Sequence, residues 1–129
     1  LHLAASLLNL GLADLRLGLE SEAADAYSEA LELCERNRYP VGAAYALLGV
    51  CGLLVQRQAW DDGARILGAA DARIAEAGAV LEATERPMRS EFEHRLESAT
   101  GRPALERLMD EGASWDLPTA IATGRRLLR

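Results

Sequence analysis

The sequence predicts an all-α protein in which antiparallel helix hairpins stack as a short solenoid of about seven helices. Half of the 129 residues are hydrophobic but only 5% are aromatic, so Leu and Ala must form the core, which is typical of closely packed helices. Val, Ile and Thr are scarce and no run alternates between apolar and polar residues, so no strand is expected.

The first hairpin is predicted over residues 1–38. Residues 3–17 place leucines on nearly every side of a helix, which Gly18 ends. Ser21 is expected to cap the second helix, in which Tyr27 and several alanines face inward while acidic residues face water. A short turn makes the two helices antiparallel.

The second hairpin is predicted over residues 41–78. Its first helix, 41–58, is apolar almost all round and therefore needs neighbours on more than one side. Its second helix, from Trp60 to Ala77, has two acidic residues in its first turn, where they favour the helix dipole, and ends at Gly78.

The first hairpin aligns with the second at a constant offset, which places Gly11 on Gly52 and Ala23 on Ala64. A helix-pair repeat of this length is typical of helical solenoids. Ala64 and Gly68 lie on one helix face and let a neighbouring backbone approach within about 8 Å. We expect this face to join the helices of a hairpin or successive hairpins, so Gly68→Leu should cost about 1 to 3 kcal/mol by overpacking.

Residues 84–129 are predicted to form C-terminal capping helices. The fifth helix is expected to open at Pro87, the sixth to follow Gly101, and the last to start at Asp116. Their apolar stripes are narrow, as in helices that cover one end of a protein. The chain is thus expected to form a single domain over residues 1–129, and its start in mid-pattern predicts a fragment of a larger protein.

Residues 7–31 resemble a tetratricopeptide repeat, a helix pair that stacks as a right-handed solenoid. The resemblance rests on these residues: Leu10-Gly11, Gly18, Ala23, Tyr27 and Ala30-Leu31. Asp14 stands where the family usually has an aromatic residue, and the second copy is degenerate.

A narrower resemblance covers roughly residues 40–122. The segment ARILGAADARIAEAG, a charged amphipathic helix, then TGRPALERLMDEG and LPTAIA are similar to the C-terminal end of the tetratricopeptide-like region in large bacterial LuxR-type and AfsR-like transcriptional regulators. The resemblance implies a module that receives signals or protein partners, whereas other domains of such regulators handle ATP and DNA.

Charge and residue usage exclude several classes of function. All 14 basic residues are Arg, so a P-loop lysine and a Schiff-base lysine are absent. A net charge of −6 argues against direct nucleic-acid contact. No run of apolar residues is long enough to predict a membrane span, and no signal peptide is visible. Cys34 and Cys51 lack CxxC spacing, which predicts buried, reduced thiols and a cytoplasmic protein.

Catalytic and metal-binding motifs are weak. Glu91 and His94, with Glu97, resemble half of a di-iron carboxylate site, but the chain lacks a second such pair, so a solvated helix face is expected. Asp61 and Asp62 diverge by about 100° on a helix and cannot share a substrate. No GxSxG elbow is present. We therefore expect neither an enzyme nor a cofactor.

Three functions remain open. The leading hypothesis is a non-catalytic module that presents a surface to a protein partner or to other domains of its own chain. The second is binding of a small effector in a groove between hairpins, with Tyr27, Tyr45 and Trp60 as candidate wall residues. Trp60 could instead pack against its own helix start.

The third is a structural dimerisation role. The first helix carries leucines on both faces, whereas a terminal repeat needs a polar outer side. Leu3 and Leu7 lie on one face and Leu8 on another. We expect this helix to pack against a preceding repeat in the full protein and against a second copy in the isolated chain.

Overall fold

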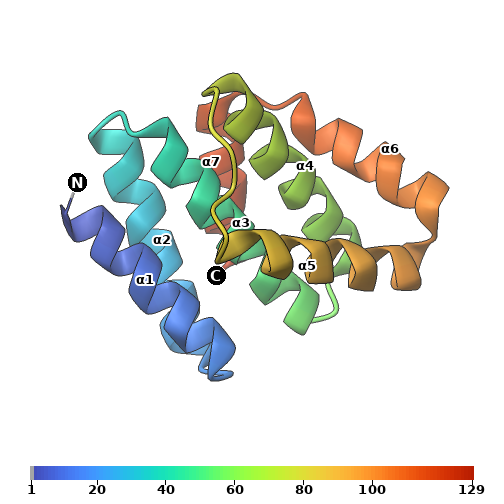
Figure 1. The fold of residues 1–129 in the computed structure, drawn as a ribbon, viewed down its shortest axis with the longest axis horizontal. Coiled ribbons are helices and arrows are strands. Elements are labelled where there is room, and N and C mark those ends of the chain that lie inside the picture. Colours follow the sequence, from blue (N-terminus) through green and yellow to red (C-terminus); the bar gives the residue numbers. More distant parts are fainter. Residues whose placement is uncertain (1) are drawn as a thin grey trace.

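The computed structural model describes residues 2–129, which form seven α-helices and no strand, so the predicted all-α class is confirmed (Figure 1). The helices are α1 (His2–Arg16), α2 (Glu20–Arg36), α3 (Pro40–Gln56), α4 (Trp60–Glu76), α5 (Glu85–Thr100), α6 (Arg102–Ala113) and α7 (Leu117–Leu127).

Helices α1 to α4 form two antiparallel hairpins, α1 with α2 and α3 with α4. The second hairpin stacks on the first, because α3 contacts both α1 and α2. Helix α3 is the centre of the molecule: every residue from Gly42 to Val55 except Tyr45 is buried. The apolar residues on all its sides are therefore explained by neighbours on all its sides.

Four consecutive helices end with the same backbone geometry, at equal intervals along the chain. In each case a residue with positive φ is followed by a residue whose N–H donates to a carbonyl five positions back, the bond of a Schellman motif. The residues with positive φ are Gly18 (74°), Arg38 (53°), Gln58 (60°) and Gly78 (68°). The two hairpins are therefore equal units, in which Gly18 corresponds to Gln58 and Arg38 to Gly78.

The predicted alignment of the two hairpins is out of register by one position. Helices α2 and α4 have equal lengths, and Glu20, which begins α2, corresponds to Trp60, which begins α4. In this register most of their buried positions also coincide. The sequence alignment paired Gly11 with Gly52 by residue type, whereas the structural register pairs Gly11 with Cys51. The two glycines have different neighbours, because Gly11 faces the ring of Tyr27 and Gly52 faces the ring of Phe92.

Two predicted helix starts are wrong, whereas those at Trp60, after Gly101 and at Asp116 are confirmed. Helix α2 begins at Glu20, and no side chain caps it, so Ser21 is not the N-cap. Helix α5 begins at Glu85, ahead of Pro87. Asp116 does cap α7, where its Oδ1 accepts from the Thr119 N–H at 2.8 Å.

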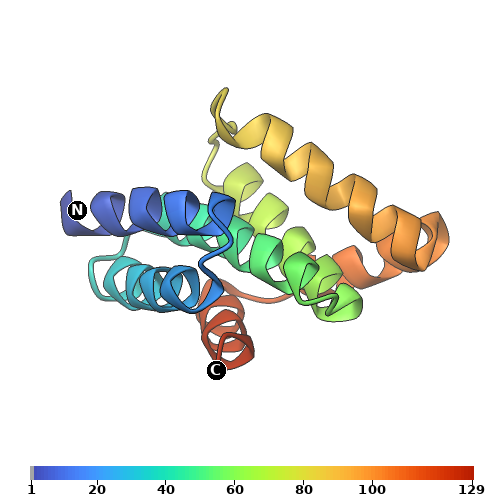
Figure 2. The same cartoon turned by 90° about the horizontal axis from the view of Figure 1, so that it is seen from below.

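The three C-terminal helices cover the second hairpin from different sides. Figure 2 shows α5 and α7 on opposite sides of the layer formed by α3 and α4. Helix α5 contacts α3 and α4, α6 lies along α4, and α7 contacts α2, α3 and α4. The three helices thus cover the second hairpin, and α7 also contacts the first hairpin through α2.

The small-residue face of α4 packs against α6. A Cβ atom on Gly68 would lie 2.0 Å from the carbonyl oxygen of Met109, and one on Gly112 would lie 1.7 Å from that of Arg65. The two backbones therefore touch at both glycines. The sequence predicted a contact within or between hairpins, and the partner is instead a capping helix that shows no repeat pattern of its own.

Candidate functional site

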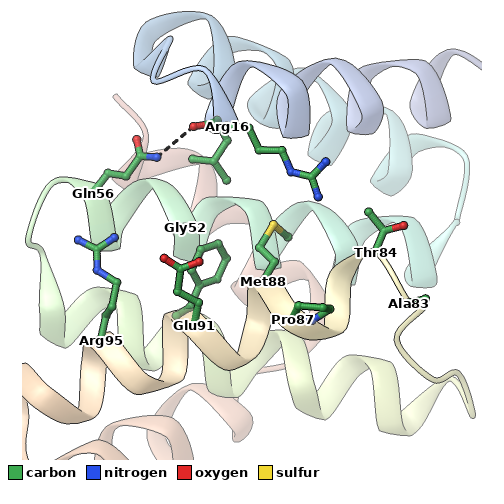
Figure 3. A pocket seen from close by; sticks show the side chains of 11 residues that line it. Arg16, Gly52, Gln56, Ala83, Thr84, Pro87, Met88, Glu91 and Arg95 are labelled. Carbon is green, nitrogen blue, oxygen red and sulfur yellow. Dashed lines mark hydrogen bonds between the residues drawn. The ribbon is translucent and has the colours of Figure 1, made fainter.

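An open groove of about 620 Å³ lies between α1 and α5, with α3 beneath it (Figure 3). We call it the α1–α5 groove. It is lined by Leu15, Arg16, Gly52, Gln56, Ala83, Thr84, Pro87, Met88, Glu91, Phe92 and Arg95.

A glycine and an aromatic ring set the depth of the groove. A Cβ atom on Gly52 would lie 2.5 Å from the Phe92 ring and 2.8 Å from a methyl group of Leu15. Phe92 is buried, so it holds α5 against α3 at this point. On the α1 side, Gln56 Nε2 donates to the carbonyl oxygen of Leu15 at 3.1 Å. Through these contacts α1 and α5, the two walls of the groove, are both packed against α3, its floor.

The groove has a polar rim and an apolar floor. Figure 3 shows Arg16 reaching from α1 toward α5, while Glu91 and Arg95 project from α5. All three side chains belong to exposed residues, whereas Leu15 and Phe92 below them are buried. A rim of both charge signs around an apolar centre is the arrangement found in protein interfaces.

A smaller cavity of about 140 Å³ lies beside the groove, and Met88 lines both. We call it the tyrosine–glutamate cavity. It is bounded by α1, by the segment between α4 and α5 with the start of α5, and by one tyrosine each from α2 and α3. Its lining residues are Ala5, Leu8, Asn9, Leu12, Tyr27, Tyr45, Glu82, Glu85 and Met88.

Tyr27 reaches this cavity from α2 by passing between two glycines. Cβ atoms on Gly11 of α1 and Gly49 of α3 would lie 2.9 and 2.1 Å from Cζ of its ring. The residue is only 2% exposed. Burial raises the pKa of the Tyr27 hydroxyl, and the charge of Glu85 adds to this rise while Arg16 opposes it. The hydroxyl is therefore neutral at physiological pH.

Tyr45 fixes the outer wall of the same cavity. Its hydroxyl donates to the carbonyl oxygen of Val80 at 3.3 Å, which holds the segment between α4 and α5 against α3. Burial raises the pKa of Tyr45, and the charges of Glu82 and Glu85 contribute to the rise. This tyrosine also stays neutral.

Glu85 has a buried carboxylate oxygen without a hydrogen-bond partner. Its Oε2 is one of two such side-chain atoms within residues 2–129, the other being Nε of Arg73. The Arg73 guanidinium still donates to the carbonyl oxygen of Trp115 at 2.8 Å through another nitrogen. Glu85 therefore combines an unpartnered buried oxygen with a place among the residues that line the tyrosine–glutamate cavity.

The structure brings together two of the three candidate wall residues and separates the third. Tyr27 and Tyr45 line the tyrosine–glutamate cavity, which Leu8, predicted for a helix interface, also lines. Trp60 lies in a shallow depression with His94 and other residues near the C-terminal end of α5. Trp60 is therefore not part of the same wall.

The sequence marked Glu91 only as a candidate metal ligand and did not identify the other charged residues of the two cavities. Arg16 is the last residue of α1, and Glu91 and Arg95 line the groove from α5. Glu82 lies in the segment between α4 and α5, and Glu85 is the first residue of α5. No spacing rule links residues from a helix end to residues of a connecting segment, so no motif could have marked them.

The leucines of α1 divide between the core and the surface. Leu7 is 8% exposed and belongs to the core, and Leu8 is partly buried, so neither is available to another molecule as Leu3 is. Leu3, Leu10 and Leu17 are 57%, 52% and 72% exposed. Leu3 and Leu10 correspond on α3 to Ala43 and Val50, which are fully buried.

The residues considered for chemistry are placed as follows. Cys34 and Cys51 are free and buried, and burial raises the pKa of both thiols. Within residues 2–129, no three His, Cys, Asp or Glu side chains are grouped so that they could hold a metal ion. In the same range, every helix is too short or too polar to cross a bilayer.

Comparisons of the chain with protein-family models, with curated proteins and with solved structures found no match.

Proposed function

We propose that the chain is a non-catalytic protein-interaction module that binds an extended segment of a partner, or of another domain of its own chain, in the α1–α5 groove. The observation that supports this most is the composition of the groove: Arg16, Glu91 and Arg95 surround a floor that includes Leu15 and Phe92. Such a floor buries apolar side chains of a peptide, and the charges of the rim fix its register.

The kind of protein to which we assign this module follows from the resemblance of residues 40–122 to bacterial LuxR-type and AfsR-like regulators. We infer a cytoplasmic regulator in which the groove receives a protein signal. The buried free thiols of Cys34 and Cys51 support a reducing compartment.

The groove is tested by selecting binders from a random-peptide display library with the wild-type chain. We expect enriched peptides, and we expect the double variant Arg16→Glu, Arg95→Glu to bind them at least roughly tenfold more weakly in fluorescence anisotropy, because two rim charges are reversed. Arg107→Glu is the matched control, since Arg107 is exposed on α6 and does not line the groove. Failure to enrich any peptide, or equal binding by the double variant, would contradict the proposal.

A second function is favoured by the outer face of α1, which we propose as a dimerisation face that binds a second copy of the chain. Its exposed residues recur at alternating spacings of three and four, the pattern of a two-helix seam. They are Leu3, Ser6, Leu10 and Ala13, together with Leu17 directly after the helix. None of the five is charged, so two copies can approach without repulsion.

Light scattering over a concentration series tests this dimer. We expect the mass to approach that of a dimer as concentration rises, and Leu10→Glu to restore the monomer, because a charge would enter the seam. Val80→Glu is the control, as Val80 is 83% exposed and lies outside α1. If the wild-type chain stays monomeric at every concentration, the proposed dimer is wrong. The partner of this face would then be a helix that is not a second copy of the chain.

A further inference from the structure

We propose that the tyrosine–glutamate cavity binds the ammonium group of a lysine side chain of the partner segment. This inference rests on the proposed peptide-binding function of the α1–α5 groove, and it adds the chemistry that the partner must present. Met88 lines both the cavity and the groove, so the two are neighbours, and a segment lying in the groove can direct one side chain toward the cavity.

The first argument is the unpartnered Oε2 atom of Glu85. A buried carboxylate oxygen without a donor is costly, and buried polar atoms in folded proteins nearly always have a partner. An ammonium group offers three donors and a positive charge, so it can supply the missing hydrogen bond and also balance the negative charge of the carboxylate. Glu82, on the same wall, supplies a second carboxylate.

The second argument is the set of neutral oxygen acceptors around the carboxylates. Tyr27 and Tyr45 line the cavity with hydroxyl groups that remain protonated, and Asn9 contributes an amide. A hydroxyl and an amide oxygen can each accept from an ammonium group. The donors of a bound ammonium group therefore meet acceptors from α1, α2 and α3.

The third argument is size and wall composition. A volume of about 140 Å³ suits a compact ammonium group better than a planar guanidinium with its five directed donors. Leu8, Leu12 and Met88 are apolar and can contact the methylene stem of lysine while its charged end meets the carboxylates.

One charge opposes the ammonium group. Arg16 lies close enough to Tyr27 to lower its pKa, but it lines the neighbouring groove and not this cavity. The carboxylates of Glu82 and Glu85 both line the cavity, so its net charge is negative. The same Arg16 would favour an acidic residue beside the lysine of the partner.

The experiment is an NMR titration of the amide-labelled chain with N-acetyl-lysine methylamide. N-acetyl-norleucine methylamide, which has an apolar stem without the charged group, is the matched probe. We expect amide shifts centred on residues 80–85 and at least roughly tenfold tighter binding of the lysine probe.

Glu85→Gln should weaken binding of the lysine probe at least roughly tenfold, because the charge is lost while the shape is kept. Glu29→Gln is the control, since Glu29 is exposed on α2 and does not line the cavity. Tyr45→Phe provides an independent variant that keeps the ring and removes a hydroxyl, and each variant is first checked for an unchanged melting temperature.

Equal binding of the two probes would overturn the inference, as would full lysine binding by a folded Glu85→Gln variant. If library selection enriches groove-binding peptides that lack lysine, the proposed function stands and this inference fails. If the lysine probe binds but no peptide is enriched, the cavity is an ammonium site and the proposed groove function fails.

Discussion

Arg38 and Gln58 adopt the left-handed backbone conformation that Gly18 and Gly78 adopt at the other two hairpin-helix ends. For a residue with a Cβ atom this conformation costs about 1 to 2 kcal/mol, which glycine avoids. The Schellman hydrogen bonds that follow each position hold the strained residues in place.

Replacing Gln58 by Gly should therefore stabilise the chain by about 0.5 to 1 kcal/mol, after allowance for the greater entropy of glycine in the unfolded state. Urea unfolding followed by circular dichroism measures the change. Gln58→Ala is the control and should give no gain, because alanine keeps the Cβ atom. Equal stabilisation by both substitutions would show that the strain is not at this backbone position.

The contact between α4 and α6 depends on glycines where backbone meets backbone. An added methyl group at Gly68 cannot be accommodated by rotating a side chain, because its nearest neighbour is the carbonyl oxygen of Met109. The whole of α6 would have to move.

We expect Gly68→Ala to destabilise the chain by about 2 to 3 kcal/mol and to reduce hydrogen-exchange protection in α6. Gly63→Ala on the same helix is the matched control. The nearest neighbour of its added Cβ would be a methyl group of Leu96 at 3.3 Å, a side-chain atom that can shift, so the higher helix propensity of alanine should make it neutral or stabilising. A Gly68→Ala chain as stable as the control would contradict the described seam.

A network of arginines and carboxylates joins α4, α5 and α6. Arg89 donates to both oxygens of Asp71, at 2.8 and 2.5 Å, and to Glu93. Arg102 donates to the other oxygen of Glu93 at 2.9 Å. The hydrogen bonds from Arg102 and Arg89 hold the pKa of Glu93 below its ordinary value.

Because the folded-state pKa of Glu93 is lowered, its contribution to stability is complete above its unfolded pKa of about 4.3 and is lost as the pH falls through the lower folded value. Glu93→Gln should therefore make stability less dependent on pH in this acidic range. Urea midpoints between about pH 5 and 3 measure the slope. Glu29→Gln should retain the wild-type slope, and an unchanged slope for Glu93→Gln would assign the acid sensitivity to other carboxylates.

At the scale of the whole molecule, α7 connects the two hairpins. Its Ile121 is 2% exposed, and its Arg125 pairs with Glu32 of α2 at 3.5 Å, while the helix also contacts α3 and α4. The last helix of the chain therefore couples the first hairpin to the second.

We expect Ile121→Ala to lower the free energy of unfolding by about 2 to 4 kcal/mol and to affect both hairpins together. Amide hydrogen exchange resolved by residue reports separately on the first hairpin, α1 with α2, and on the second, α3 with α4. Arg126→Ala, at an exposed position of α7, should stay within about 0.5 kcal/mol of wild type. Loss of exchange protection in α3 and α4 alone would show that α7 does not couple the hairpins.

The sequence predicted the helices well because their leucine and alanine spacing and the glycines at their ends are local signals. It missed the register of the two hairpins because Arg38 and Gln58 take a conformation that residue type does not reveal. It named Tyr27 and Tyr45 as wall residues of one groove, and both line the tyrosine–glutamate cavity, whereas it placed Leu8 at a helix interface. It missed Glu85, because the path of a connecting segment depends on tertiary contacts such as that of Tyr45 with Val80.

The position of Tyr27 between Gly11 and Gly49 has a consequence for dynamics. A half-turn flip of its phenol ring sweeps a wider volume than the flat ring occupies, so α1 and α3 must briefly separate for each flip. The exchange rate between the two edges of the ring, seen as averaged or separate proton resonances, therefore reports how often the stacked hairpins open.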